Sequence, residues 1–418
     1  TNGTTPPASL ADGSTQITSV SSLATSYNNT GLTAATQYYY IVVPFGYDGS
    51  NSATYNYNTT SPKTTTAYTL SNPASGQPTP LNATGTSPSQ INLTWSSVTA
   101  TGFLIYRLPG GTSPNVSAIL NGAAPPASLA DGSTLITTAA GGVTAYNNTG
   151  LPPATQYSYT IVPFTYDGSH AGTYNYLLPS APTANAYTYS SSPSGQPASF
   201  SATAAGYNQI NLSWSSGVTS IAGFLIYRLP GNTSVSLTGL NSGSAPPSPL
   251  GDGSTLIATV GSGAISYSDN SGLSGGTKYQ YKLVPFGYDG SHAQTYNFLT
   301  AGAKASNATT FSNNSTITYV SSTSPVSIAY IDYSAVGAPI DNTNSVRLGQ
   351  FNVNDLGGDG QPTTLSSVTI SIANNANVAE IAIFDSGQNN VGQVTNPGSS
   401  ATFNGLSTIS AADGSFDY

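Results

Sequence analysis

The hydrophobic residues of this chain alternate with polar ones in short runs. In INLTWSSV at residues 91–98 and INLSWSSG at residues 210–217, isoleucine, leucine and tryptophan occupy every second position. A period of two places such side chains on one face of a β-strand, so we expect Trp95 and Trp214 to lie in the core. Apolar residues at spacings of three and four do not persist long enough to predict a helix. The pattern predicts an all-β protein.

The predicted strands belong to a repeat. PPASLADGST at residues 6–15 returns at 125–134 and, as PPSPLGDGST, at 246–255, which are offsets of 119 and 121 residues. A segment of the form VPFxYDGS follows the same spacing and begins at Val43, Val162 and Val284. The apolar run GFLIYRLPG, present twice, is followed by a stretch rich in Pro, Gly, Ser and Thr that cannot continue a sheet. The chain therefore repeats a module of about 120 residues.

Each copy of the repeat has a leucine six residues before a tyrosine, in GLTAATQY, GLPPATQY and GLSGGTKY. The pairs are Leu32 with Tyr38, Leu151 with Tyr157 and Leu273 with Tyr279. Together with a tryptophan on the second strand, this pattern resembles the fibronectin type III family, in which a tyrosine corner opens the sixth strand. The resemblance implies tandem immunoglobulin-like β-sandwiches, in which the corner hydroxyl bonds a backbone group upstream. The modules exceed the usual size of about 100 residues, and the excess follows GFLIYRLPG and YDGS.

The repeat predicts four domains. Residues 1–71 form an incomplete fibronectin type III-like module without its first strands, and residues 72–189 and 190–311 form two complete ones. Residues 312–418 form a distinct β-sandwich-like module, which we expect to be truncated. Its segment at 346–372 resembles modules of large surface adhesins of Bacteroidota. The incomplete ends have two explanations: the chain is the ordered part of a longer repetitive protein, or strands of a neighbouring subunit complete its open sheet edges.

The composition narrows the possible partners. Only 5 % of the residues are charged, against about 25 % in ordinary proteins, and seven basic residues at a net charge of −8 cannot form a stripe that binds phosphates. We therefore expect no nucleic-acid partner. Cysteine and methionine are absent, which excludes disulfides and thiolate metal sites and suits an exposed, oxidising location. No stretch approaches 18 apolar residues, so we expect no membrane span.

The acidic residues and histidines do not predict catalysis. In each YDGS segment an aspartate precedes a glycine, which is typical of a turn; these residues are Asp48 and Gly49, Asp167 and Gly168, and Asp289 and Gly290. The only glutamate leaves no recurring carboxylate pair. His170 and His292 follow two of the turns, without a nucleophile and an orienting acid, and we expect them to be exposed loop residues. We predict a non-enzyme without catalytic, cofactor or metal sites.

Tyrosine is the one abundant residue with binding chemistry, with 28 copies. The motifs TYNY and TYNF recur after YDGS and contribute Tyr55, Tyr57, Tyr174, Tyr176 and Tyr296. Aromatic rings stack on the apolar faces of sugars, and they also cover neighbouring modules or subunits. These residues are candidate interface or glycan contacts.

The sequence favours a secreted structural or adhesive repeat protein at the bacterial cell surface, either a segment of an adhesin or a filament subunit that polymerises by strand complementation. Its partners would be other copies of itself or neighbouring repeats of a longer chain, glycans or a cell surface. One alternative is a non-catalytic spacer and carbohydrate-binding region of a secreted polysaccharide-degrading enzyme. Another is a surface-layer or sheath protein.

Overall fold

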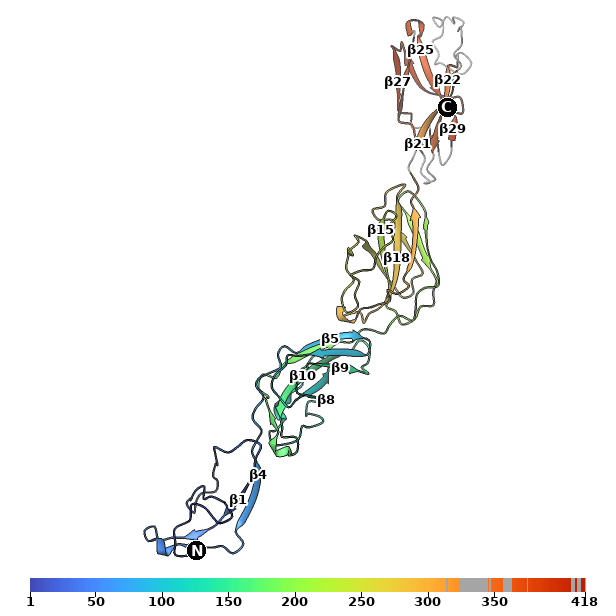
Figure 1. Cartoon of the computed structure of the whole chain (residues 1–418). Coiled ribbons are helices and arrows are strands. Elements are labelled where there is room, and N and C mark those ends of the chain that lie inside the picture. Colours follow the sequence, from blue (N-terminus) through green and yellow to red (C-terminus); the bar gives the residue numbers. More distant parts are fainter. Residues whose placement is uncertain are drawn as a thin grey trace. The chain divides into compact units, whose positions relative to one another are not determined.

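The computed structural model is built almost entirely of antiparallel β-structure (Figure 1). It describes residues 1–312, 315–322, 345, 347–355, 363–373, 375–406, 410–411 and 415–417. The helices in these residues are three-residue 3₁₀ turns, none of which could cross a bilayer. Two compact units form: Thr1–Ser191 with the loops Ser242–Ser244 and Ser291–Tyr296, and the remainder. The predicted all-β class is confirmed.

The second module, residues 72–189, is a sandwich of two sheets. One sheet has the order β5-β6-β9, and the other has the order β11-β10-β7-β8 with β12 also paired to β10. The strands are β5 (Asn82–Ser87), β6 (Gln90–Thr94), β7 (Gly102–Pro109), β8 (Thr134–Ala140), β9 (Ala145–Thr149), β10 (Gln156–Thr165), β11 (Asn175–Tyr176) and β12 (Thr183–Tyr187), with 3₁₀ turns η2 (Val116–Ala118) and η3 (Ala171–Thr173).

Strand β10 is buried on both faces. Tyr157, Tyr159 and Ile161 point into the core between the sheets, where the side chains of β6 and β7 meet them. The alternate residues Val162 and Phe164 join a second cluster formed with the long loop after β7. Two apolar faces explain why this strand reads as a nearly continuous hydrophobic run in the sequence.

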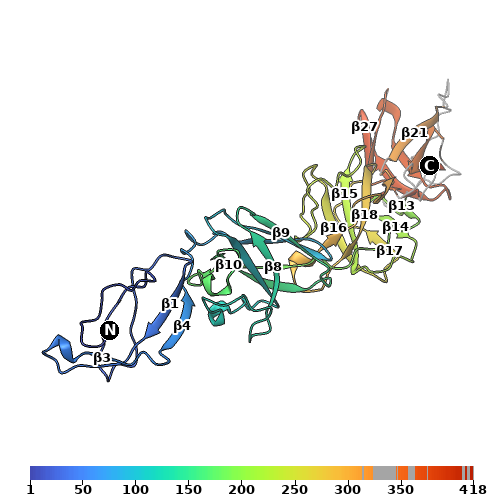
Figure 2. The same ribbon diagram turned by 60° about the horizontal axis from the view of Figure 1, so that its bottom comes forward.

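The third module repeats this topology, with sheets β13-β14-β17 and β16-β15-β18-β19, and β20 paired to β18 (Figure 2). Its elements are β13 (Phe200–Ala204), β14 (Ile210–Trp214), β15 (Gly223–Pro230), β16 (Thr255–Gly261), β17 (Ser266–Asp269), β18 (Lys278–Gly287), η4 (Ala293–Thr295), β19 (Asn297–Phe298) and β20 (Lys304–Thr309). The chain is thus a tandem of fibronectin type III-like β-sandwiches, followed by a different β module.

The first module has only part of this architecture. Strand β1 (Gln37–Val42) pairs with β4 (Lys63–Tyr68), and β2 (Phe45–Gly46) pairs with β3 (Asn56–Tyr57) beside η1 (Ser52–Thr54). Residues 16–20 and 26–30, which align with β8 and β9, form no regular strand. The reason is that β8 and β9 pair with β7 and β6, which have no counterpart in residues 1–71.

The C-terminal module has a different strand order from the repeat. Its sheets are β21-β22-β29, β23-β28, β24-β27 and β25-β26, and Val353, Leu365, Ile383 and Phe403 are among its core residues. The segment VSIAYIDY at residues 326–333, whose alternating pattern also predicts a strand, lies outside the described residues. The elements are β21 (Ser315–Ser322), β22 (Gly349–Asp355), β23 (Thr363–Thr364), β24 (Ser367–Ser371), η6 (Asn375–Asn377), β25 (Glu380–Phe384), β26 (Asn390–Thr395), β27 (Ser400–Asn404), β28 (Ser410–Ala411) and β29 (Ser415–Asp417).

Candidate functional site

The two tryptophans occupy matching places in two sandwich cores. Trp95 and Trp214 are each 5 % exposed and meet a phenylalanine of the facing sheet edge-on, at ring-centroid distances of 5.8 Å and 5.6 Å. The indole N–H of Trp214 donates to the Ala264 carbonyl at 2.8 Å. The Trp95 nitrogen is buried and has no hydrogen-bond partner among the described residues.

The tyrosine corners differ in their hydrogen bonds. The Tyr38 hydroxyl accepts the Thr33 backbone N–H at 3.1 Å, and the Tyr279 hydroxyl accepts that of Ser274 at 2.9 Å. At the matching position before Tyr157 stands Pro152, which has no N–H to donate. The leucine six residues before each tyrosine is buried in the second module and half-buried in the others; these are Leu151, Leu32 and Leu273.

The YDGS segments form tight turns. Oδ1 of Asp48 accepts the N–H groups of Ser50 and Asn51 at 2.9 and 2.8 Å, and Asp167 accepts those of Ser169 and His170, both at 2.8 Å. Backbone N–H donors, chiefly from Asn51 and His170, lower the pKa of both carboxyls. Asp289 stands directly before the glycine of the third turn. The three turn glycines, Gly49, Gly168 and Gly290, have positive φ angles of 92°, 94° and 93°.

The tyrosines after these turns stack on one another. The Tyr55 ring lies between the rings of Tyr47 and Tyr57, at centroid distances of 4.1 Å and 5.7 Å, and the three ring planes are nearly parallel. The second module repeats the ladder with centroid distances of 4.1 and 5.5 Å, formed by Tyr166, Tyr174 and Tyr176. In the third module, Tyr296 is half-buried, and its backbone carbonyl accepts a hydrogen bond from the Gly243 N–H at 2.8 Å. The ring faces in the first two ladders thus largely cover one another.

Two histidines stack on tyrosines at the ends of strands. The ring of Tyr68, the last residue of β4, stacks on the His170 ring. The ring of Tyr187, the last residue of β12, stacks on the His292 ring in the same way. In both pairs the ring centroids are 4.5 Å apart and the ring planes are nearly parallel. We call these contacts the Tyr–His joints. Nδ1 of His170 also lies 2.7 Å from an Asp167 oxygen.

Backbone hydrogen bonds accompany both joints. The Ser71 N–H donates to Thr173 O at 2.9 Å, and Ser190 N–H donates to Thr295 O at 2.8 Å. At the first joint, the Asn175 side chain adds a bond to the Ser71 carbonyl at 2.7 Å. All these groups belong to the first compact unit. Each joint therefore fixes the segment after a module's last strand onto the YDGSH loop and 3₁₀ turn that follow.

The histidines are the feature that reasoning from the sequence missed. His170 and His292 are exposed loop residues, as predicted, and the His170 side chain is 49 % exposed; the prediction did not include their stacking on tyrosines. A signal was present: His170 and His292 each follow a module that ends its last strand in tyrosine. The first copy has Asn51 in place of histidine, and the third module has Thr309 in place of the strand-end tyrosine.

The arginines that end the GFLIYR runs cover the tyrosine corners. Arg228 places Nη1 2.9 Å from both carboxylate oxygens of the fully buried Asp269, and its guanidinium lies 5.4 Å from the Tyr279 ring. In the second module Arg107 makes a 3.3 Å hydrogen bond to neutral Asn148 instead. These contacts join strands within one sandwich and contribute to its packing.

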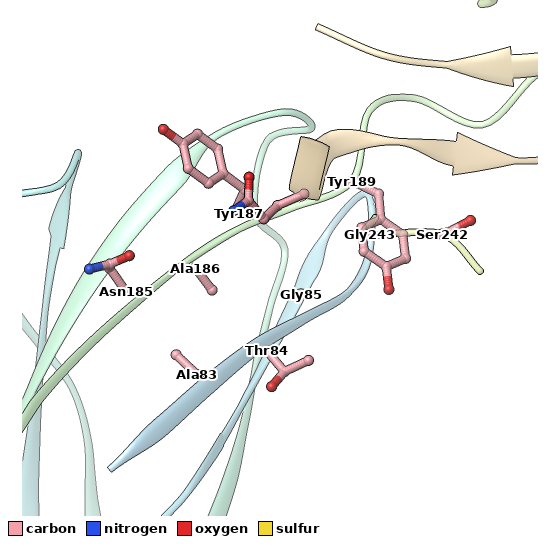
Figure 3. A pocket seen from close by; sticks show the side chains of 10 residues that line it. Ala83, Thr84, Gly85, Asn185, Ala186, Tyr187, Tyr189, Ser242 and Gly243 are labelled. Carbon is pink, nitrogen blue, oxygen red and sulfur yellow. The ribbon is translucent and has the colours of Figure 1, made fainter. Parts of the chain in front are cut away.

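A small hollow of about 230 Å³ lies in the first unit (Figure 3). Its lining comprises Ala83, Thr84, Gly85, Asn185, Ala186, Tyr187, Tyr189, Ser242, Gly243 and Gln294. Tyrosine hydroxyls are the ionisable groups of this lining, so the hollow offers polar contacts and ring faces but no carboxylate, amine or imidazole. In the part of the chain that the structure describes, no three His, Asp or Glu side chains gather as a metal site would require.

Comparison with known proteins finds similarity only at the level of solved structures. No family model matches the chain, and no curated protein matches it. The FN1–FN3 domains of chicken CNTN1 are 14 % identical, with 67 % of this chain and 79 % of that chain covered and a TM-score of 0.28. A segment of two fibronectin type III domains from chicken tenascin is 13 % identical, with 54 % and 99 % covered and a TM-score of 0.24. Neither superposition is close, and the strand order within each module defines the fold.

Proposed function

We propose that this chain is a non-catalytic structural and adhesive repeat of the bacterial cell surface, part of an adhesin or of an extracellular filament. The observation that carries the proposal is the Tyr–His joint, which occurs twice with the same ring distance of 4.5 Å and an equivalent backbone hydrogen bond. A joint built from repeated side chains is expected where successive modules bear load or hold an adhesive region away from a surface.

The packing within the modules supports a mechanical role. The Gln77 side chain donates to the carbonyls of Leu177 and Pro179, each at 2.8 Å, and Gln196 makes the matching bonds in the third module at 2.7 and 3.1 Å. These bonds attach the segment that enters each sandwich to a loop about 100 residues later in the chain. Tension on the entering segment would therefore meet hydrogen bonds before it reached the core.

The filament form of the proposal requires copies to join. Strand addition is the route by which a sheet edge gains a partner from another chain. We propose that copies of this chain polymerise by such strand complementation.

Electron microscopy of native material, purified without refolding, tests the proposal. Filaments with an axial repeat and continuous density between subunits are the expected result for a polymer, and separate thin rods would restrict the role to an adhesin stalk. Two-dimensional sheets would instead favour a surface layer, and globular particles would contradict a structural role altogether.

A glycan-binding spacer is the second candidate. It is favoured by Tyr39, whose side chain is 74 % exposed on β1 and could stack on a sugar ring. It receives less support from the tyrosine ladders, because their rings stack on one another. Sedimentation of the chain with insoluble cellulose, chitin or xylan separates the candidates: retention that is lost in Tyr39→Ala would favour glycan binding.

A further inference from the structure

Two pairs of tyrosines lie face to face across the YDGS loops, and we call them the stacked tyrosine pairs. In the first module the rings of Tyr47 and Tyr55 have a centroid distance of 4.1 Å and an interplanar angle of 6°. Tyr166 and Tyr174 repeat both values in the second module. Carbon atoms in van der Waals contact are about 3.5–4.0 Å apart, so the two rings of each pair lie largely over one another. Ring carbons of one tyrosine are therefore in contact with ring carbons of the other.

The backbone holds each stacked tyrosine pair in this position. Tyr166 follows the last residue of β10 and Tyr174 precedes the first residue of β11, so the two face each other across the end of an antiparallel hairpin. Inside the loop, the Asp167 N–H donates to the Thr173 hydroxyl at 3.2 Å, and the same bond in the first module measures 3.3 Å. A pair that is fixed from both sides needs little rearrangement before its rings react with each other.

The third ring of each tyrosine ladder differs from the stacked pair. Tyr57 and Tyr176 lie farther from the neighbouring ring, at centroid distances of 5.7 and 5.5 Å. Their hydroxyls donate to the backbone carbonyls of Thr4 and Ala123 at 2.7 and 2.8 Å, and Tyr176 is only 4 % exposed. Tyr47 is 39 % exposed, and both tyrosines of the second-module pair are half-buried. The stacked tyrosine pairs thus combine close ring contact with access to solvent.

We propose that the stacked tyrosine pairs are sites of oxidative cross-linking, at which a one-electron oxidant joins the two rings as dityrosine. The bond would close each YDGS loop covalently in a protein that has no cysteine, as a disulfide does in other proteins. In the second module the closed loop carries His170, which belongs to the first Tyr–His joint. The cross-link goes beyond the proposed adhesive or filament role and does not depend on it, because it requires only the loop and an oxidant.

The reaction removes two electrons and two protons from each pair. Each phenol gives one electron to the oxidant and its hydroxyl proton to water, which leaves a phenoxyl radical with unpaired spin on the oxygen and on the adjacent Cε atoms. One Cε atom of each ring then joins the other in a carbon–carbon bond. The two hydrogens on these carbons move to the phenolic oxygens, which restores both aromatic rings. The bond begins to form along the normal to each ring plane, and a face-stacked partner lies in that direction.

The test uses the whole 418-residue chain at micromolar dilution. Photogenerated tris(bipyridine)ruthenium(III) is the one-electron oxidant, and persulfate is the final electron acceptor. Endoproteinase Asp-N cuts before aspartate, and therefore between Tyr47 and Asp48 and between Tyr166 and Asp167. We expect mass spectrometry to find the two peptides of each loop joined, with a combined mass lower by two hydrogen atoms, together with dityrosine fluorescence.

Phenylalanine variants identify the tyrosines that react. Tyr47→Phe keeps the stacked ring but lacks the phenol, so it should lose the first joined peptide and keep the second, and Tyr166→Phe should do the reverse. The matched control is Tyr39→Phe, at a residue that is 74 % exposed, which should keep both. Unfolding in urea before oxidation should lower the yield of joined peptides by about tenfold, because the ring contact is lost while the separation along the chain is unchanged.

Three results would overturn the proposal. They are the absence of joined peptides from the folded chain, their persistence in the matching phenylalanine variant, and an equal yield from the chain in urea. Coupling mainly between separate molecules, seen as covalent dimers on a denaturing gel, would also overturn it, because the rings would then react through exposure and not through their stacking.

Discussion

At the scale of single residues, the two complete modules differ in the group that faces the arginine of the GFLIYR run. Asp269 is fully buried and receives Arg228 and the Tyr281 hydroxyl, which lies 2.8 Å from its carboxylate. Asn148 takes the same position in the second module and donates to the Tyr159 hydroxyl at 2.8 Å. A buried carboxylate depends on its cation far more than a neutral amide does, so the two arginines should contribute unequally.

Arg228→Ala should destabilise the third module by about 3–5 kcal/mol, because it leaves the Asp269 charge buried without its cation. Arg107→Ala should cost the second module only about 1 kcal/mol. The chain has two tryptophans, one in each module, so fluorescence in a Trp95→Phe or Trp214→Phe background follows one module at a time during urea unfolding. The double variant Arg228→Ala/Asp269→Asn should recover most of the loss; equal losses from the two arginine variants would contradict this account.

Buried tyrosines should make both modules sensitive to alkali. Burial raises the pKa of Tyr106, Tyr159 and Tyr227 to about 12, above the ordinary value of about 10. The folded state thus favours the neutral hydroxyl, so this contribution is complete below pH 10 and is lost as the pH rises from 10 towards 12. We expect cooperative loss of β-structure by circular dichroism in that window, coincident with tyrosinate absorbance at 295 nm. Tyr227→Phe should move the transition of the third module to higher pH, and an unchanged transition would count against the mechanism.

At the scale of elements, the sequence predicts those features that depend on local pattern. The period of two in INLTW and INLSW predicts strands, and β6 and β14 are such strands. The same reasoning fails at residues 16–20 and 26–30, which resemble β8 and β9 in sequence but form no regular strand. A strand requires a pairing partner as well as an alternating pattern. Residues 16–20 and 26–30 have the pattern, but no counterparts of β7 and β6 are present for them to pair with. The Tyr–His joints eluded prediction for a related reason, since Tyr68 and His170 are remote in sequence.

The tyrosine corner offers a comparison between elements of the same fold. Tyr279→Phe should destabilise the third module by about 1 kcal/mol, because the Ser274 N–H loses its acceptor. Tyr157→Phe should have little effect on the second module, where Pro152 provides no N–H at the matching position. Urea unfolding followed by the tryptophan of each module measures both values. A loss at Tyr157 as large as that at Tyr279 would mean that the corner acts through some contact other than this hydrogen bond.

At the scale of the whole molecule, the modules have few charged residues and no disulfides that could stabilise them. Within the first compact unit, ring stacking and a backbone hydrogen bond at the first Tyr–His joint connect the end of β4 to the loop of the second module. A stacked aromatic pair contributes about 0.5–1.5 kcal/mol beyond its buried area, so a single joint is strong enough to order a linker yet weak enough to open reversibly. The joint can therefore open locally while the sandwiches stay folded.

The first joint can be weakened without touching either core. Tyr68→Ala removes the ring that stacks on His170, and the segment at residues 70–77 should then open more often. Since proteolysis follows the population of the open form, we expect cleavage within 70–77 by proteinase K to rise roughly two- to tenfold, as the stacking energy implies. Tyr68→Phe keeps the ring and should behave like the unmodified chain, as should Tyr39→Ala, which removes an exposed tyrosine of the same module. If Tyr68→Ala and Tyr68→Phe are cleaved equally fast, the stacked rings do not hold the joint, and the hydrogen bonds of Ser71 with Thr173 and Asn175 must hold it instead.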